Sequence, residues 1–90
     1  SAIREEIQGQ AQDQLDKLCA TLSVPESNRH LVTGRPESEI PTQAKAVACD
    51  LIIVGTHARW GLALLLGSTT DGVMHGAECD VLAVKVDAAL

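Results

Sequence analysis

Residues 50–86 constrain the fold more than any other part of the chain; they read DLIIVGTHARWGLALLLGSTTDGVMHGAECDVLAVKV. The segment begins with a continuous apolar run at residues 51–54 and ends with a second apolar stretch at residues 81–86, which only Lys85 interrupts. Continuous apolar runs are typical of strands that are covered on both faces in a parallel sheet. Between them lie a glycine-bearing loop at residues 55–66 and a short helix that begins at Ser68 or Thr69, either of which can cap it. The order predicts one parallel α/β unit.

The N-terminal part of the chain adds a helix. Apolar residues recur at steps of three and four over residues 3–22, namely at Ile3, Ile7, Ala11, Leu15, Leu18 and Leu22. This spacing predicts an amphipathic helix with one buried stripe. Pro25 follows too closely for the helix to continue.

The middle of the chain predicts a strand and a further helix. Residues 30–33 are β-prone and precede Gly34, which suits a turn. Pro36 suits a first helical position, whereas Pro41 predicts either a kink or a helix that starts properly only near that residue. The resulting order, α-β-α-β-α-β, predicts one α/β domain over residues 1–90 with a parallel sheet.

Composition excludes several classes of function. The 90 residues carry a net charge of −5 and contain one Trp, no Phe and no Tyr. Acidic chains repel nucleic acid and anionic membranes, and stacking on bases needs aromatic residues. The longest apolar run, residues 62–66, is too short to cross a bilayer. We therefore predict no nucleic-acid partner and no membrane span.

The cysteines predict the redox compartment. Cys19, Cys49 and Cys79 are odd in number, and none forms a C-x-x-C pair. Each lies next to apolar residues, which favours buried thiols in a reducing cytoplasm over a disulfide or a zinc site. The first residues given are charged and polar and do not have the pattern of a signal peptide, which fits the same expectation.

The glycine loop is a candidate anion site. In parallel sheets, ligands bind where strand C-termini meet helix N-termini. Gly55 closes the predicted strand at residues 51–54, and Gly67 opens the helix that follows the loop. The free N–H groups and the dipole of that helix favour an anion. The hydroxyls of Ser68 and Thr69 can add hydrogen bonds, and Arg59 can add charge. The alternative is that these are turn glycines and a helix cap.

The pieces DLIIVG and LLLGST, followed by GAECDVLAVKV, resemble the C-terminal half of a universal stress protein. The resemblance covers the whole chain. It implies a Rossmann-like fold of the adenine nucleotide alpha hydrolase-like kind, without its N-terminal strand-helix-strand. The family's sheet has the strand order 3-2-1-4-5, so residues 30–33 and 51–54 would lie three places apart, or ~14 Å at ~4.8 Å per strand. A sheet cannot skip that distance, so we expect the centre to come from a longer chain or another molecule.

The resemblance also implies a nucleotide loop, from which this sequence departs. Nucleotide-binding members have Gly, two residues, Gly, nine residues, Gly and then Ser or Thr. Here Gly55 matches the first glycine and Gly67 with Ser68 the last pair, but the second glycine is Ala58 and only eight residues, 59–66, follow it. If position 58 needs positive φ, its Cβ costs about 1–2 kcal/mol. ATP or another adenine nucleotide is thus an alternative cofactor, and the family's adenine-contacting Asp has no counterpart here.

Other side chains offer weaker candidates. His57 lies in the loop near Ser68 and suggests a small hydrolase, but no G-x-S-x-G turn surrounds the serine. His30 and His75 show no metal spacing with the cysteines, and we predict no metal site. Trp60 favours an interface or an apolar surface over a base.

The resemblance implies a homodimer. Universal stress proteins commonly pair through the last strand, and an apolar edge strand invites pairing. The interface residues we predict are Val81, Leu82, Val84 and Val86. We therefore expect a cytoplasmic stress-response module that acts through dimerisation and protein interactions, without nucleotide turnover and with no catalytic residue. ATP binding stays the alternative.

Overall fold

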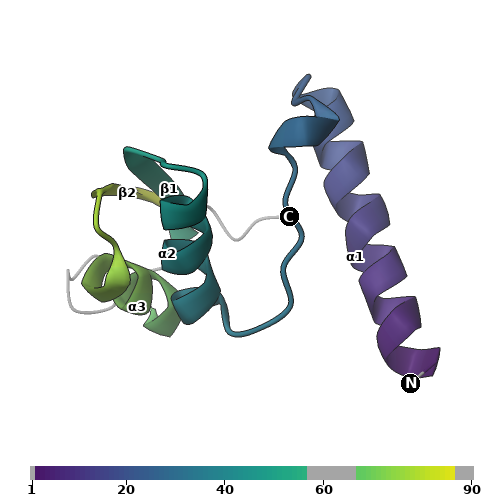
Figure 1. Cartoon of the computed structure of the whole chain (residues 1–90), viewed down its shortest axis with the longest axis horizontal. Coiled ribbons are helices and arrows are strands. Elements are labelled where there is room, and N and C mark those ends of the chain that lie inside the picture. Colours follow the sequence, from purple (N-terminus) through teal and green to yellow (C-terminus); the bar gives the residue numbers. More distant parts are fainter. Residues whose placement is uncertain (1, 57–66, 87–90) are drawn as a thin grey trace. The chain divides into compact units, whose positions relative to one another are not determined.

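The computed structural model describes residues 2–56 and 67–86 (Figure 1). The chain divides into two compact units, Ser1–Val32 and Thr33–Leu90. The first contains the helix α1 (Ala2–Thr21) and the 3₁₀-helix η1 (Glu26–Asn28). The second contains α2 (Pro36–Ala46), β1 (Leu51–Thr56), α3 (Ser68–Gly76) and β2 (Asp80–Lys85). The second unit has the alternation that the sequence predicts for an α/β fold.

Helix α1 forms as predicted, but its apolar stripe is not buried. Cys19 is the buried residue of this helix, whereas four large side chains are 58–71% exposed: Ile3, Ile7, Leu18 and Leu22. The first unit consists of one long helix and one short 3₁₀-helix. It therefore has no second layer that could cover a stripe of this length.

The predicted strand at residues 30–33 is wrong. These residues have no regular secondary structure, and the sheet consists of β1 and β2. β-prone residues form a strand only where a neighbouring strand accepts their backbone hydrogen bonds. Among the described residues, no strand lies beside residues 30–33 to pair with them.

Helix α2 begins at Pro36 and runs through Pro41, so it does not start near the second proline. Pro41 instead contributes to the crossing with α3. A Cβ added to Gly76 would lie 3.1 Å from Pro41 Cγ, and one added to Gly72 would lie within contact distance of the Glu37 Cβ. Two glycines four residues apart on α3 thus let the helices approach closely.

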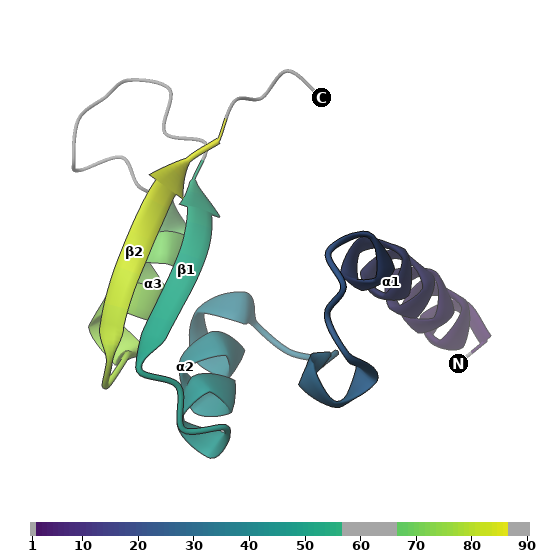
Figure 2. The same ribbon diagram turned by 90° about the horizontal axis from the view of Figure 1, so that it is seen from above.

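The two strands pair in parallel, from Leu51 opposite Asp80 to Thr56 opposite Lys85 (Figure 2). The core of the unit comprises Ala44, Ile52 and Val73. Val54 and Val81 pack against this core, as do Ile40, Ala77 and Cys79. Alternate residues of each strand therefore face helices α2 and α3.

The opposite sheet face is exposed in this unit, so the prediction of strands covered on both faces is wrong for the described residues. Ile53 is 64% exposed, and Leu51, Leu82 and Val84 are 44–50% exposed. Both helices of the unit that contact the sheet pack on the Ile52 face. The continuous run at residues 51–54 could not reveal this, because it has no alternation to mark a solvent face.

Helices α1 and α2 end in the same way. After α2, Cys49 N donates to Ala44 O at 2.9 Å and Ala48 N donates to Lys45 O at 3.1 Å, with Ala48 at φ +56°. After α1, Ser23 adopts φ +58° in the equivalent position. This is the Schellman arrangement, in which the left-handed residue is usually glycine.

Replacing either left-handed residue with glycine should therefore stabilise the protein. A left-handed L-residue costs about 1–2 kcal/mol, and the added chain entropy of glycine offsets part of that gain, so we expect Ala48→Gly and Ser23→Gly each to raise the free energy of unfolding by about 0.5–1 kcal/mol. Urea unfolding measures this gain, provided that the dependence of the free energy of unfolding on urea concentration stays the same. Ala20→Gly, inside α1, is the control and should destabilise by about 1 kcal/mol. If Ala20→Gly and Ala48→Gly changed the free energy of unfolding in the same direction, the assignment of Ala48 to a left-handed Schellman position would be wrong.

Candidate functional site

The candidate site lies where β1 ends and α3 begins. Gly55 is the fifth residue of β1 rather than a loop residue, so the strand is longer than predicted. Gly67 is the N-cap of α3 at φ +85° and ψ +157°. This backbone conformation favours glycine. The strand C-terminus and the helix N-terminus thus occupy the positions at which parallel sheets bind ligands.

The described residues leave the first turn of α3 open. None of them lies within 4 Å of a Cβ built on Gly67, and Gly67, Ser68 and Thr69 are exposed. Ser68 and Thr69 lie inside the helix, and no side-chain hydrogen bond caps it among the described residues, so the predicted cap is wrong. The hydroxyls and the first-turn N–H groups are therefore available to an anion.

Gly55 is crowded by the end of the last strand. A Cβ added to Gly55 would lie 2.9 Å from Val86 Cγ2. The Val86 N–H also donates to Thr56 O at 2.8 Å, so Val86 continues the parallel ladder beyond β2. One side of Gly55 is thus occupied by the isopropyl group of Val86. The requirement for glycine at position 55 has a packing cause that does not involve a ligand.

Sequence reasoning missed two buried threonines beside these glycines. Thr56 is 6% exposed and Thr70 is 3% exposed. No buried side-chain nitrogen or oxygen in the described part of the chain lacks a hydrogen-bond partner. Thr56 lies two and four residues after Val54 and Ile52, so it points to the same face of the strand. The two-residue period of a strand could therefore have placed it on the face that the helices cover.

Three candidate residues, His57, Ala58 and Arg59, lie outside the described residues, as does Trp60. The structure therefore brings together Gly55, Val86 and the start of α3, but it does not test the proposed hydrolase pair. Of the other histidines, His30 is exposed. His75 Nδ1 lies 2.8 Å from Asp71 O, one turn earlier in α3. Among the described residues, no three His, Cys, Asp or Glu side chains gather to hold a metal ion.

The cysteines differ in exposure. Cys19 is buried and Cys79 is half-buried, but Cys49 is exposed, so the prediction of three buried thiols is wrong for Cys49. All three are free. Cys49 follows the left-handed Ala48, and this turn carries it away from the core of the second unit.

The four predicted interface residues, three in β2 and one just beyond it, divide between the two faces of the sheet. Val81 packs against the core, whereas Leu82, Val84 and Val86 are 50%, 44% and 38% exposed. The last three share one parity and therefore one face. The apolar surface on this side also includes Ile53, which pairs with Leu82 in the register.

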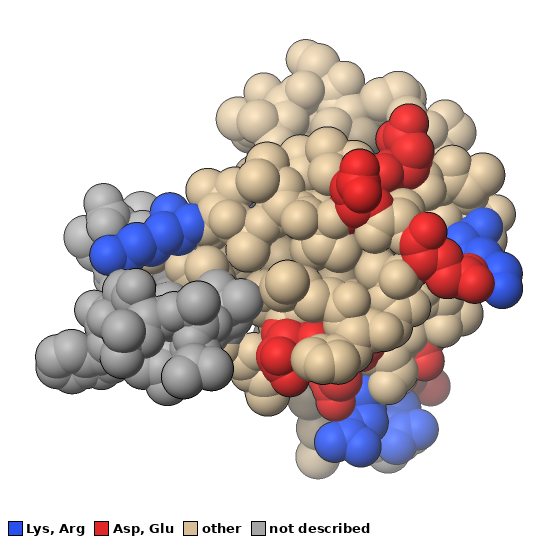
Figure 3. Space-filling view, turned by 90° about the vertical axis from the view of Figure 1, so that its left-hand side faces the viewer, with Lys and Arg blue, Asp and Glu red and all other residues tan. Residues whose placement is uncertain are grey.

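Basic side chains do not form a continuous patch on the face drawn in Figure 3. Arg35 Nε lies 3.0 Å from Glu37 Oε1, and Lys45 Nζ lies 3.2 Å from Glu78 Oε2. Pairing of this kind differs from the contiguous basic surface that a nucleic acid requires. In the described part of the chain, no helix has the length and apolar character to cross a bilayer.

The parallel strands, the helices on one sheet face and the glycine-bounded junction define a Rossmann-like α/β protein. The chain belongs to the universal stress protein family, because the sequence model of that family matches residues 1–85. It is 42% identical over 77 residues to "Universal stress protein A homolog 2" of Coxiella burnetii, covering 86% of this chain and 53% of that protein.

Two further relatives support the assignment. "Universal stress protein A homolog 1" of Coxiella burnetii is 39% identical over 82 residues, covering 91% of this chain and 57% of that protein. "Universal stress protein E" of Salmonella typhi is 33% identical over 88 residues, covering 97% of this chain and 28% of that protein. The chain thus spans about half the length of the two A-type relatives. The family membership and the α/β fold class that the sequence predicts are confirmed.

Proposed function

We propose that this universal stress protein acts in the cytoplasm as a dimeric interaction or regulatory module, without nucleotide turnover. The observation that carries the proposal is the end of the chain at β2 and Val86, which presents Leu82, Val84 and Val86 beside a backbone edge that no described strand pairs. The three free thiols suit a reducing compartment.

The backbone of β2 has an edge that can accept a second copy. The Val86 N–H points to β1, because it donates to Thr56 O. Strand backbones alternate with a period of two, so the N–H of Ala83 points to the other side. Neither described strand pairs there. An unpaired apolar edge favours antiparallel pairing with the same strand of a second molecule.

Three features weigh against nucleotide turnover. Ala58 replaces the glycine of the family's nucleotide loop, and the loop is one residue shorter. Val86 Cγ2 occupies the space beside Gly55. The open first turn of α3 favours the alternative, an adenine nucleotide held by Gly67, Ser68 and Thr69, but it supplies only the last part of that loop.

Removing one edge donor should weaken the dimer. Ala83→Pro deletes an N–H that the ladder with β1 does not use, and proline is tolerated on edge strands. Each copy loses one hydrogen bond worth about 0.5–1.5 kcal/mol, so the dissociation constant of the dimer should rise about 10- to 100-fold. Sedimentation velocity of the full protein over a concentration series measures the change.

Two controls accompany this experiment. Ala83→Ser keeps the donor and should dimerise like the unchanged protein. Calorimetric titration with ATP should show no binding in the micromolar range for either variant. A protein that is monomeric before substitution would refute the dimer, whereas micromolar ATP binding would refute the absence of a nucleotide and favour the alternative.

A further inference from the structure

The pairing of β2 with the same strand of a second copy, which the proposed function assumes, has a small set of possible registers. The Val86 N–H points to β1, so the backbones that point outward belong to Ala83 and to the residues two positions before and after it. In a symmetric antiparallel pair, only outward-pointing residues exchange hydrogen bonds, so the two-fold axis must pass at a residue. The axes that keep most of the strand paired lie at Leu82, Ala83 or Val84.

The two faces of β2 differ in the side chains that they offer to a partner. On the open face, Leu82 and Val84 are 50% and 44% exposed, and Asp80 is exposed at the start of the strand. On the other face, Val81 packs against the core, and Lys85 is exposed at the end of the strand. Charges therefore lie at both ends of β2 with apolar side chains between them. The register decides which of these side chains meet a charge.

An axis at either neighbour of Ala83 makes an unfavourable contact. An axis at Leu82 sets Val84 directly opposite the partner's Asp80, so a carboxylate faces an apolar side chain on each side of the axis. An axis at Val84 sets Lys85 diagonal to the partner's Lys85. Residues on this diagonal lie ~7–8 Å apart, within reach of long side chains, and like charges repel at that distance.

An axis at Ala83 avoids both contacts. It sets Leu82 opposite the partner's Val84 on both sides of the axis, and such apolar cross-strand pairs stabilise a sheet. Ala83 then faces the partner's Ala83, where two methyl groups do not crowd the backbones. Asp80 lies opposite the partner's Val86 at the ends of the paired segment, where the exposed carboxylate stays in water.

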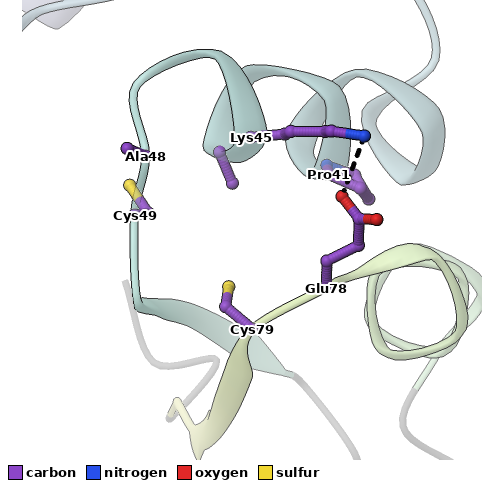
Figure 4. Close-up of a pocket in the computed structure, with 7 residues that line it drawn as sticks. Pro41, Lys45, Ala48, Cys49, Glu78 and Cys79 are labelled. Atoms are coloured by element: carbon purple, nitrogen blue, oxygen red, sulfur yellow. Dashed lines mark ion pairs between the residues drawn. The ribbon is translucent and has the colours of Figure 1, made fainter.

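The same register brings the second copy to a hollow of about 290 Å³ at the amino end of the strands (Figure 4). The hollow is lined by Pro41, Ala44, Lys45, Ala48, Cys49, Glu78 and Cys79. Cys79 lies two residues before Val81, and both pack against the core. The partner's Lys85, which lies opposite Val81, is therefore diagonal to Cys79 at ~7–8 Å. The carboxyl end of one strand thus borders the hollow of the other copy.

We propose that two copies pair through β2 about a two-fold axis at Ala83, so that the partner's Lys85 borders the hollow of each copy. This register rests on the proposed function and adds the geometry of its interface. Because the strands are antiparallel, each end of the shared sheet carries the hollow of one copy and the glycine-bounded junction of the other.

Disulfide cross-linking of cysteine variants of the full protein tests the register. Each variant also carries Cys49→Ser, which removes the exposed native thiol. Ala83→Cys should convert most chains to covalent dimers, because a hydrogen-bonded pair holds its Cα atoms ~5.5 Å apart, within the range of a disulfide. Leu82→Cys and Val84→Cys should each stay uncross-linked alone, at ~7–8 Å, yet should cross-link to each other when mixed.

Mild oxidation, non-reducing electrophoresis and mass spectrometry of the linked peptides give the readout. Leu82 and Val84 are exposed, and Ala83→Cys adds only a sulfur atom, so the fold should persist. Circular dichroism checks this. Sedimentation velocity of the Cys49→Ser protein is the reference, because it shows whether a dimer forms before any cysteine is introduced.

The outcomes separate the register from the dimer itself. A dimer in which Leu82→Cys or Val84→Cys cross-links alone would move the axis to that residue and overturn the register. A dimer in which no variant cross-links, alone or mixed, would show that the copies do not pair through this edge. Equal cross-linking at all three positions would show random collision. A protein that stays monomeric would refute the proposed function, and the register with it.

Discussion

Gly72→Ala should lower the free energy of unfolding by about 1–2 kcal/mol. The new methyl group would collide with the Glu37 Cβ and would lie 3.1 Å from Glu37 Cγ and 3.6 Å from Glu37 Cα. Because the first contact is close to the backbone of α2, a rotamer change cannot relieve it, and the helices must move apart. Overpacking costs about 1–3 kcal/mol, and a contact that no rotamer change relieves belongs in the upper half of that range. The higher helix propensity of alanine returns ~1 kcal/mol, which leaves a net loss of about 1–2 kcal/mol.

Gly9→Ala is the matched control, because it makes the same substitution in a helix with free space. No atom of the described residues lies within 4 Å of a Cβ added to Gly9. We expect this variant to gain about 1 kcal/mol from propensity. Urea unfolding of both variants measures the difference. A stabilising effect of Gly72→Ala would show that the two helices do not cross as closely as the structure indicates.

Gly55→Ala should also destabilise the protein, and Val86→Ala should rescue it. The added Cβ would lie 2.9 Å from Val86 Cγ2, on a short and stiff side chain. We expect a loss of about 1–2 kcal/mol for Gly55→Ala and a coupling energy of about 1 kcal/mol with Val86→Ala in a double-mutant cycle. The measurement is the free energy of unfolding of the four proteins in the cycle.

Val84→Ala provides the control for this cycle. Val84 has the same side chain as Val86, lies two residues earlier on the same sheet face and is opposite Gly55 in the register. Among the described residues, only Val86 reaches within 4 Å of the added Cβ. The Gly55 and Val84 substitutions should therefore combine additively. Full stability of Gly55→Ala would leave ligand approach, rather than packing, as the reason for glycine at this position.

Several elements of the fold were predictable because their signals are local. Pro36 marks the start of α2 because its missing N–H costs nothing at a first helical position. The apolar runs at residues 51–54 and 81–86 correspond to β1 and β2. Gly67 marks the start of α3 through a backbone conformation that favours glycine.

The errors concern partners rather than local conformation. Residues 30–33 have the β-branched composition of a strand, but a strand also needs a neighbour, which composition cannot supply. Ile3 and Ile7 have helical spacing, but spacing does not provide the layer that would bury them. Ser68 is a favoured cap residue, yet Gly67 takes that position and places Ser68 inside the helix.

At the candidate site, the glycines were predictable and their surroundings were not. Gly55 and Gly67 stand out in the sequence beside the substituted Ala58. The contact between Gly55 and Val86 depends on the register of two strands, which the apolar runs alone do not specify. The same holds for Cys49 and Cys79, whose common cavity follows from the pairing of Leu51 with Asp80.

The sequence alone was enough to assign the universal stress protein family, the α/β class and the departure at Ala58. These depend on periodicity and short motifs, which act within a few residues along the chain. The close crossing at Gly72, the packing reason for Gly55 and the hollow lined by Cys49 and Cys79 emerged only from the tertiary structure. Each of these features is a contact between residues that are far apart in the sequence. Such a contact depends on the register of the strands and on how closely the helices approach, and not on the neighbouring residues in the chain.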